Sequence, residues 1–238
     1  MQTATPAARK PAAFIGEYIS RDYYEYLIEG YDNQHPTEQK SVFIAKATIL
    51  AALDEFPTAS GLRFMYGLKA GDQESSRTIV LMACNDTSTD RLLPNLIMAP
   101  EGYLIDSGEK TAFRECREML SRYVRRMHSL MPEQPVKIIP RSCFYGINSL
   151  KALLQQKDCA GVNYHFGYNP DIQHVPERYQ TVLEAINQHR ESLGIFVDQG
   201  KLCPPTCPTG PDLPGSAIFS HAFPGVEGAI EQLDGPAS

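Results

Sequence analysis

Apolar residues recur at helical spacing in two regions of the chain, each followed by shorter segments with strand-like patterns. The first region is aromatic and has a three- and four-residue period that predicts an amphipathic helix. Its apolar positions are Phe14, Ile15, Tyr18, Ile19, Tyr23, Tyr26, Leu27 and Tyr31. Pro36 ends this helix, and Thr37 is a plausible N-cap for a second helix with an apolar stripe through residues 43–53, closed by Pro57.

Strand-like patterns follow these two predicted helices. Leu62, Phe64 and Tyr66 alternate with other residues, which predicts a strand over 61–68. The more continuous apolar run 78–84 predicts a central strand that forms a hairpin with the first, and 103–106 predicts a third strand.

The same order of patterns returns about one hundred residues later. Residues 113–130 predict an amphipathic helix, and Ser142 or Asn148 is a plausible cap for the next helix, which runs to Leu154. Strands are expected at 161–167, 181–187 and 194–198. Taken alone, 181–187 would also suit a helix, but its match to the β-branched segment 79–85 favours a strand.

Matching sequences indicate an internal duplication. Residues 47–53 (ATILAAL) resemble 147–153 (INSLKAL), and glycines frame an aromatic segment in both regions, at 61–67 and 161–167. We therefore expect an α+β fold of two tandem α-α-β-β-β repeats, mostly antiparallel and related by a pseudo-twofold axis. The expected divisions are an N-terminal tail (1–11), repeat 1 (12–110), repeat 2 (111–207) and a Pro/Gly-rich C-terminal arm (208–238). The repeats are expected either to pack their bare sheet faces together or to join edge strands.

Composition and charge narrow the classes of function. The net charge is −6, and the densest basic patch, Arg122, Arg125 and Arg126, suits a solvated helix face better than nucleic-acid binding. No run reaches the roughly 18 apolar residues that cross a membrane. No apolar segment follows Arg9 and Lys10, so we expect no signal peptide, no membrane insertion and a cytoplasmic protein.

Cys203-Pro-Pro-Thr-Cys207 is the string that most resembles a site. Such a pair holds a metal, forms a disulfide or packs structurally, and structural packing is favoured here. Zinc takes four ligands and usually two such pairs, and the histidines provide no HxxxH partner. We therefore expect no cofactor, with zinc as the alternative.

Aromatic residues of the glycine-framed strands are the candidate ligand-binding set: Tyr66, Tyr164, His165 and Phe166. His165 occupies the position of Met65 in the first repeat, so a hydrogen-bonded histidine is favoured over a catalytic one. A nucleophilic pair of Cys159 with His165 is disfavoured, because the sequence places no orienting Asn or Asp beside them. Asp106 and Asp198 end the third strands, where turn formation is favoured over acid–base chemistry.

The second repeat resembles a group of small uncharacterised proteins of Bacteroidota-type bacteria. The resemblance rests on Cys159-x-Gly161-x-x-Tyr164-x-x-Gly167 with the terminal Cys-Pro-Pro-x-Cys at 203–207, and covers about residues 140–207, more faintly 40–108. The first repeat departs from the pattern, with Ala59 in place of Cys159. The resemblance implies a bacterial source and no established activity.

These patterns favour a non-enzymatic structural or interaction protein, a subunit of a homo- or hetero-assembly. The C-terminal arm, at 217–233, is the candidate contact with a protein partner or a second copy, because it is apolar at 217–223 and suits a short helix at 226–233. The alternative is a small-molecule or metal-binding module with a pocket between the repeats. A redox enzyme that uses Cys203 and Cys207 is the third hypothesis.

Overall fold

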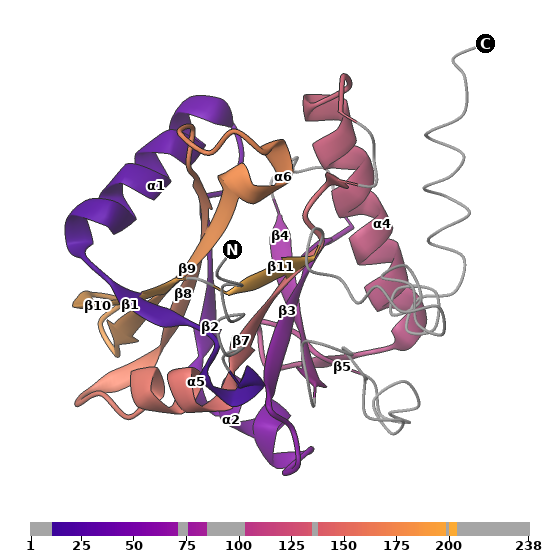
Figure 1. Ribbon diagram of the computed structural model, residues 1–238. Helices are drawn as coiled ribbons and strands as arrows, with labels where there is room; N and C mark the ends of the chain where they lie inside the picture. Colours follow the sequence, from indigo (N-terminus) through magenta and orange to yellow (C-terminus); the bar gives the residue numbers. More distant parts are fainter. Residues whose placement is uncertain (1–10, 71–75, 85–102, 135–137, 199, 204–238) are drawn as a thin grey trace, which may run out of the picture.

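The computed structural model describes residues 11–70, 76–84, 103–134, 138–198 and 200–203 (Figure 1). The helices are η1 (Ala12–Phe14), α1 (Arg21–Gln34), α2 (Lys46–Asp54), α4 (Phe113–Leu130), α5 (Ile147–Leu154) and α6 (Val175–Arg178). The strands are β1 (Glu17–Ile19), β2 (Ser41–Ala45), β3 (Gly61–Leu68), β4 (Arg77–Cys84), β5 (Tyr103–Leu104), β6 (Lys110–Thr111), β7 (Ser142–Gly146), β8 (Cys159–Tyr168), β9 (Tyr179–Asn187), β10 (Ser192–Asp198) and β11 (Lys201–Cys203). The chain is therefore a mixed α+β protein, as predicted.

The described strands pair in antiparallel fashion and form two main sheets. One sheet has the order β1-β10-β9-β8-β2, and the other has the order β11-β7-β3-β4. A short third ladder joins β5 to β6, and a single bridge from Val80 to Ile105 connects it to β4. The predicted hairpin of β3 and β4 is confirmed, with the register Gly61 to Cys84 through Leu68 to Arg77.

Each main sheet contains two strands from the other half of the chain: β1 and β2 join β8, β9 and β10, and β7 and β11 join β3 and β4. β2 precedes β3 in sequence but pairs with β8, with Val42 opposite Tyr164. β7 precedes β8 but pairs with β3, with Phe64 opposite Cys143. The exchange makes each sheet depend on residues more than seventy positions away, so neither half completes its own sheet.

Glycines at the start of β3 and β8 permit this exchange. A Cβ atom on Gly61 would lie 2.1 Å from the carbonyl oxygen of Tyr145 in β7, and one on Gly161 would lie 2.5 Å from the carbonyl oxygen of Ile44 in β2. Any side chain at either position would force the exchanged strand away. The first glycine of each framed segment therefore marks the place where the strand from the other half approaches.

The second glycine of each frame lies under a long helix. A Cβ atom on Gly67 would lie 2.9 Å from Cβ of Met119 in α4, and one on Gly167 would lie 3.1 Å from Cβ of Leu27 in α1. In Figure 1, α1 lies on the left and α4 on the right with the sheets between them, and α2 and α5 lie at the bottom.

Aromatic side chains join the two sheets in the core. The rings of Phe64 in β3 and Tyr164 in β8 stack with centroids 5.3 Å apart, and Tyr66 meets Phe166 edge to face at 5.4 Å. All four side chains are buried. The two sheets therefore pack against each other through aromatic side chains, and each sheet mixes strands of both halves rather than belonging to one half as expected from the sequence.

The predicted element order, α-α-β-β-β, lacks a strand in both regions. Residues 41–45 and 142–146 were assigned to the helices that follow them, whereas they form β2 and β7 and the helices begin at Lys46 and Ile147. The alternating burial of β2 suits an edge strand, with Val42 and Ile44 in the core. The partner that makes each segment a strand lies in the other half of the chain.

The first predicted helix also begins too early. Residues 14–19 form part of η1 and the strand β1, which pairs with β10 through Tyr18 and Val197. α1 begins at Arg21, and the Ser20 hydroxyl caps it by accepting a hydrogen bond from the backbone N–H of Tyr23 at 3.2 Å. The aromatic period continues across this boundary, which is why the pattern alone extended the helix.

Other predictions are confirmed. Residues 181–187 lie in β9, residues 194–198 lie in β10, and α4 spans the whole segment 113–130. No helix in the described part of the chain is long and apolar enough to cross a membrane. The C-terminal arm (208–238), including its candidate contact 217–233, lies outside the described residues, as do residues 1–10 of the N-terminal tail.

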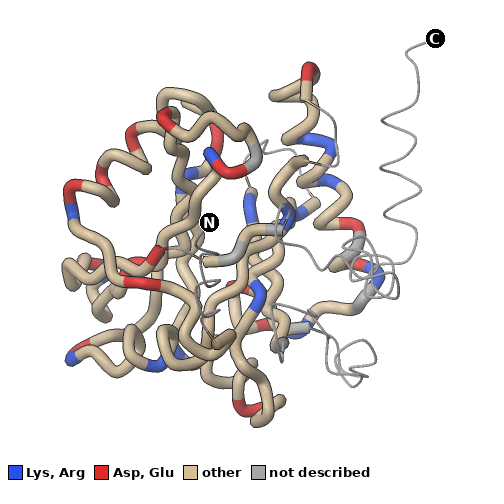
Figure 2. Tube along the Cα trace, in the orientation of Figure 1, with Lys and Arg blue, Asp and Glu red and all other residues tan. Residues whose placement is uncertain are grey.

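Charged residues of both signs lie on the helices, and arginines gather on α4 (Figure 2). In the predicted basic patch, Arg122 Nη2 lies 2.8 Å from Glu115 Oε1, and Arg126 donates to Glu38. Arg125 donates to a backbone carbonyl of its own helix. Two of the three arginines are thus paired with carboxylates.

Candidate functional site

The structure brings three of the four candidate ligand-binding residues together. Tyr66, Tyr164 and Phe166 meet between the sheets, and the Tyr66 and Tyr164 hydroxyls lie 2.9 Å apart. His165 lies on the other face of β8, because successive side chains of a strand point to opposite faces. The four residues therefore do not form one site.

His165 is held between β9 and α1. Its Nε2 lies 2.7 Å from Glu184 Oε2 and 3.4 Å from the Tyr24 hydroxyl, and Asn163 donates to the same carboxylate at 3.4 Å. Burial acts to raise the pKa of Glu184, but hydrogen bonds from its neighbours, His165 first, outweigh it and leave this pKa below its ordinary value. The cluster ties α1 to the outer face of the sheet.

The cysteines singled out in the sequence are separated. Cys203 ends β11 opposite Ser142, and Cys207 lies outside the described residues. Cys159 is buried and donates to the carbonyl of Gly161 at 3.4 Å. Within the described residues, no group of three or more His, Cys, Asp or Glu side chains is arranged to hold a metal ion.

The carboxylates and amides at strand ends stabilise local structure. Asp106 accepts hydrogen bonds from the Thr78 hydroxyl and from the backbone N–H of Ile79, and Asn187 Oδ1 accepts from the N–H groups of His189 and Glu191. These contacts fit the turn role that the sequence favours.

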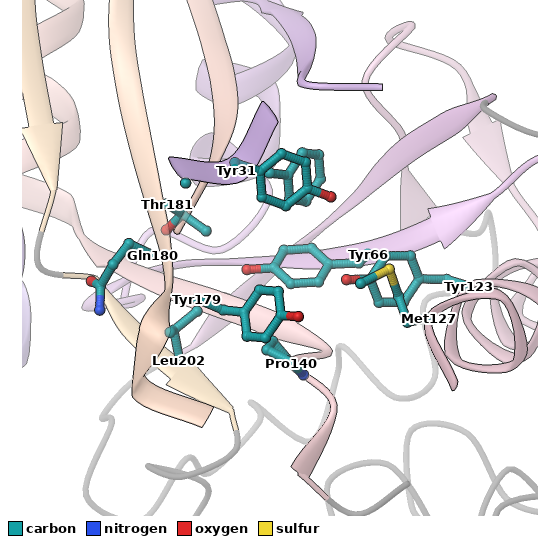
Figure 3. Close-up of a pocket in the computed structure, with 11 residues that line it drawn as sticks. Tyr31, Tyr66, Tyr123, Met127, Pro140, Tyr179, Gln180, Thr181 and Leu202 are labelled. Atoms are coloured by element: carbon teal, nitrogen blue, oxygen red, sulfur yellow. The ribbon is translucent and has the colours of Figure 1, made fainter. Parts of the chain in front are cut away.

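A small tyrosine-rich pocket lies at the junction of the two sheets and the long helices (Figure 3). Both halves of the chain contribute to it. Its lining residues are Tyr31, Tyr66, Tyr123, Met127, Pro140, Phe166, Gly167, Tyr179, Gln180, Thr181 and Leu202. The free space is enough for about one water molecule, so in this conformation it admits only a very small ligand.

A buried charged cluster adjoins this pocket. Glu38, in the segment between α1 and β2, accepts hydrogen bonds from Arg126 Nη2 at 2.7 Å and Nε at 3.0 Å, and from Arg77 Nη2 at 3.2 Å. The side chains of Arg77 and Glu38 are each 1% exposed, and that of Arg126 is 25% exposed. Two guanidinium groups thus share one carboxylate where little water reaches them.

Aromatic rings surround the guanidinium of Arg77. Its Cζ lies 4.2 Å from the ring centroid of Phe166, 5.4 Å from that of Tyr31 and 5.8 Å from that of Tyr123. Such cation–π contacts contribute about 2 kcal/mol when desolvated. All three rings also line the pocket, so the cation and the cavity share their walls.

The Tyr31 hydroxyl is a further polar neighbour of this guanidinium. Burial raises the pKa of Tyr31, and the positive charge of Arg77 and a side-chain hydrogen bond with it act in the opposite direction. Arg77 thus interacts with the Tyr31 hydroxyl as well as with the Glu38 carboxylate. The buried arginine therefore has a hydroxyl and an anionic partner beside the pocket.

His35 adds no positive charge near neutral pH. Its Nε2 lies 3.1 Å from the Tyr179 hydroxyl, and burial, followed by the repulsion of Arg77, lowers the pKa of His35 to about 4. The imidazole is neutral at pH 7, and the net charge of the cluster comes from the two arginines and Glu38.

Sequence reasoning did not identify this cluster. Glu38, Arg77 and Arg126 come from three segments: a connection, the first residue of β4 and the last third of α4. The pattern contained one signal, an arginine directly before the apolar run 78–84, where a buried charge needs a partner. Comparison with protein-family models, with curated proteins and with solved structures finds no significant match.

Proposed function

We propose that the protein is a non-enzymatic interaction protein that works as a subunit of an assembly. The supporting observation is a concentration of exposed aromatic side chains in residues 14–23, where Phe14, Tyr18 and Tyr23 are 52%, 58% and 36% exposed. These are the large apolar side chains that the described residues leave exposed, and all three precede or begin α1. Aromatic residues are enriched at the centres of protein interfaces.

The strand beside these residues supports the same proposal. Within the described part of the chain, β1 pairs with β10 and with no other strand, so it is an edge of its sheet. An edge strand offers backbone N–H and C=O groups to an added strand, and neighbouring side chains then select the partner. The partner proposed here is a protein that extends this sheet at β1 and covers Tyr18.

A photo-cross-linking experiment tests the proposal. Benzoylphenylalanine placed at position 18 is expected to form a discrete adduct with a partner or a second copy in cells. The control places it at Arg114, a surface position on α4 whose side chain is 84% exposed. No adduct from position 18, together with a monomeric mass by light scattering across the concentration range, would refute the proposal.

A second candidate function is the binding of a small molecule between the halves. The observation that favours it is the pocket, which residues of both halves line beside the buried Arg77. Metal or disulfide chemistry at Cys203 and Cys207 also remains a proposal. Elemental analysis for zinc and thiol counting distinguish these states.

We also propose that the two halves, 12–110 and 111–207, are repeats related by a pseudo-twofold axis. Three observations support this: the strand exchange, the helix–strand–helix order before β3 and before β8, and the equivalent approaches at Gly61 and Gly161. Separately expressed halves are expected to be poorly folded alone and to regain structure when mixed. If either half folded independently, the strand exchange would not be required for folding.

A further inference from the structure

The helix α2 presents an apolar face to the solvent. Its buried side chains are Thr48, Ile49, Ala52 and Leu53. On the opposite side, Ala47 and Ala51 are exposed and Leu50 is only partly buried. Residues three and four positions apart are neighbours on a helix, so these three side chains share one face. The face of a surface helix that lies opposite the core is normally polar, and α2 departs from this rule.

The corresponding helix in the second half of the chain has a polar face instead. In the match of 47–53 to 147–153, Ala51 corresponds to Lys151 of α5, which is exposed together with Asn148. Lys151 also lies in the last turn of α5, where the partial negative charge of the helix end favours a cation. A helix of this kind therefore packs against the sheets without exposed alanines, and the packing of the fold does not explain the apolar face of α2.

The charges on α2 lie at the ends where its own dipole disfavours them. Lys46 is the first residue of the helix and Asp54 is the last, and the helix has no acidic residue in its first turn and no basic residue in its last. The N-terminus of a helix carries partial positive charge and the C-terminus partial negative charge. Among the described residues, neither Lys46 nor Asp54 forms an ion pair, whereas the neighbouring Glu55 pairs with Lys110.

A second copy of α2 in antiparallel orientation removes both conflicts. Lys46 of each copy then lies beside the C-terminus and Asp54 of the other copy, and Asp54 lies beside the other N-terminus. The apolar face forms the centre of the contact, where small alanine side chains allow the two helix axes to approach closely. Both copies use the same patch, so the contact is twofold symmetric and closes at a dimer.

We propose that α2 is a self-association surface through which two copies of the chain pair as antiparallel helices. The proposal rests on the proposed assembly function and deepens it, because it names a second copy as partner and a surface separate from β1. In Figure 1, β1 lies on the left and α2 lies at the bottom. One face of a nine-residue helix is smaller than the roughly 800 Å² per partner of stable complexes, so the expected dimer is weak and forms reversibly as the concentration rises.

A charge exchange between two variants of the full chain tests the proposal. Sedimentation velocity at low ionic strength is expected to show wild type shifting from monomer to dimer with concentration. Lys46→Glu and Asp54→Lys each bring like charges together at both ends of the contact, and each is expected to weaken dimerisation by about tenfold or more. An equal mixture of the two variants is expected to form a mixed dimer with wild-type affinity, because the acidic face of one variant meets the basic face of the other. Native mass spectrometry with one variant isotope-labelled identifies this mixed dimer.

Folding and location are controlled separately. Both substitutions agree with the dipole of α2, so each variant is expected to keep or raise the Tm of wild type, which separates lost dimerisation from unfolding. Lys151→Glu, on the exposed face of α5, is the matched control and is expected to dimerise as wild type does. A wild type that stays monomeric, a dimer that survives both α2 substitutions, or a mixture without mixed dimer would overturn the proposal. The adduct from position 18 tests the β1 interface alone, so the two proposals fail separately.

Discussion

Replacing Gly161 by alanine is expected to separate β2 from β8 and to destabilise the protein. The added Cβ would lie 2.5 Å from the carbonyl oxygen of Ile44 and 2.6 Å from the Phe43 ring. The oxygen is backbone, so relief requires the whole strand to move by about 0.9 Å to reach the 3.4 Å of ordinary contact. That movement stretches the ladder that connects the two halves.

Gly167→Ala is the matched control for this substitution. It lies in the same strand and makes the same change in the unfolded chain. Its Cβ would meet the Leu27 side chain at 3.1 Å, and the Gln180 side chain and carbonyl oxygen only at 3.6 Å, which is ordinary contact. Alanine restricts the unfolded chain in both variants, which favours folding by about 0.4–1 kcal/mol. Overpacking against backbone costs about 1–3 kcal/mol. Gly161→Ala is therefore expected to be about 2 kcal/mol less stable than Gly167→Ala.

Circular dichroism during thermal unfolding measures the difference. For a chain of this size, about 2 kcal/mol corresponds to a Tm gap of roughly 4–8 °C. Urea titrations of the same variants give the free energies of unfolding directly. Equal Tm values for the two variants would refute the argument that the exchanged strand requires a glycine at position 161.

Three further predictions concern buried polar groups. Glu38→Gln is expected to lower the free energy of unfolding in urea by about 3–5 kcal/mol, since it leaves two arginines without a carboxylate. Asp32→Asn breaks an exposed pair with a lysine and is expected to lower it by less than about 1 kcal/mol. The pKa of Glu184 is below its ordinary value of 4.5 in the folded protein, so its carboxylate stabilises the fold above that pH and this contribution is lost as the pH falls through the folded pKa. Glu184→Gln is therefore expected to flatten the acid side of the profile of stability against pH. An unchanged profile would contradict this. Burial raises the pKa of the Cys116 and Cys143 thiols to about 12, so maleimide at about pH 8 is expected to label them only after unfolding, as peptide mass spectrometry can show; rapid labelling of the native protein would be inconsistent with their burial.

Helices and strands with a local sequence pattern were predicted, whereas strands that depend on a partner far away in the sequence were missed. The strands β3, β4 and β10 and the helix α4 were predicted because each contains its own periodic signal. The strand β9 was predicted from the match of 181–187 to 79–85, because its own helix formers also suit a helix. β2 and β7 were missed because they are short, precede helices directly, and owe their strand conformation to partners in the other half.

The candidate site shows the same limit. Tyr66, Tyr164 and Phe166 were grouped correctly as neighbours because period two places them on facing sheet surfaces. His165 was grouped with them although strand alternation directs it to α1. The cluster of Glu38 with Arg77 was not predicted, because hydrogen bonds between distant segments leave no periodic pattern.

The sequence by itself determined the class of fold, the positions of most elements and the two glycine-framed strands, since these depend on local periodicity and on residues without side chains. Only the tertiary structure decided which strands pair across the halves, which face of β8 each aromatic residue occupies, and where the buried pair of Arg77 and Glu38 lies. These properties depend on the relative placement of segments far apart in the chain. The same placement that closes the sheets buries Arg77 among the aromatic rings that line the pocket.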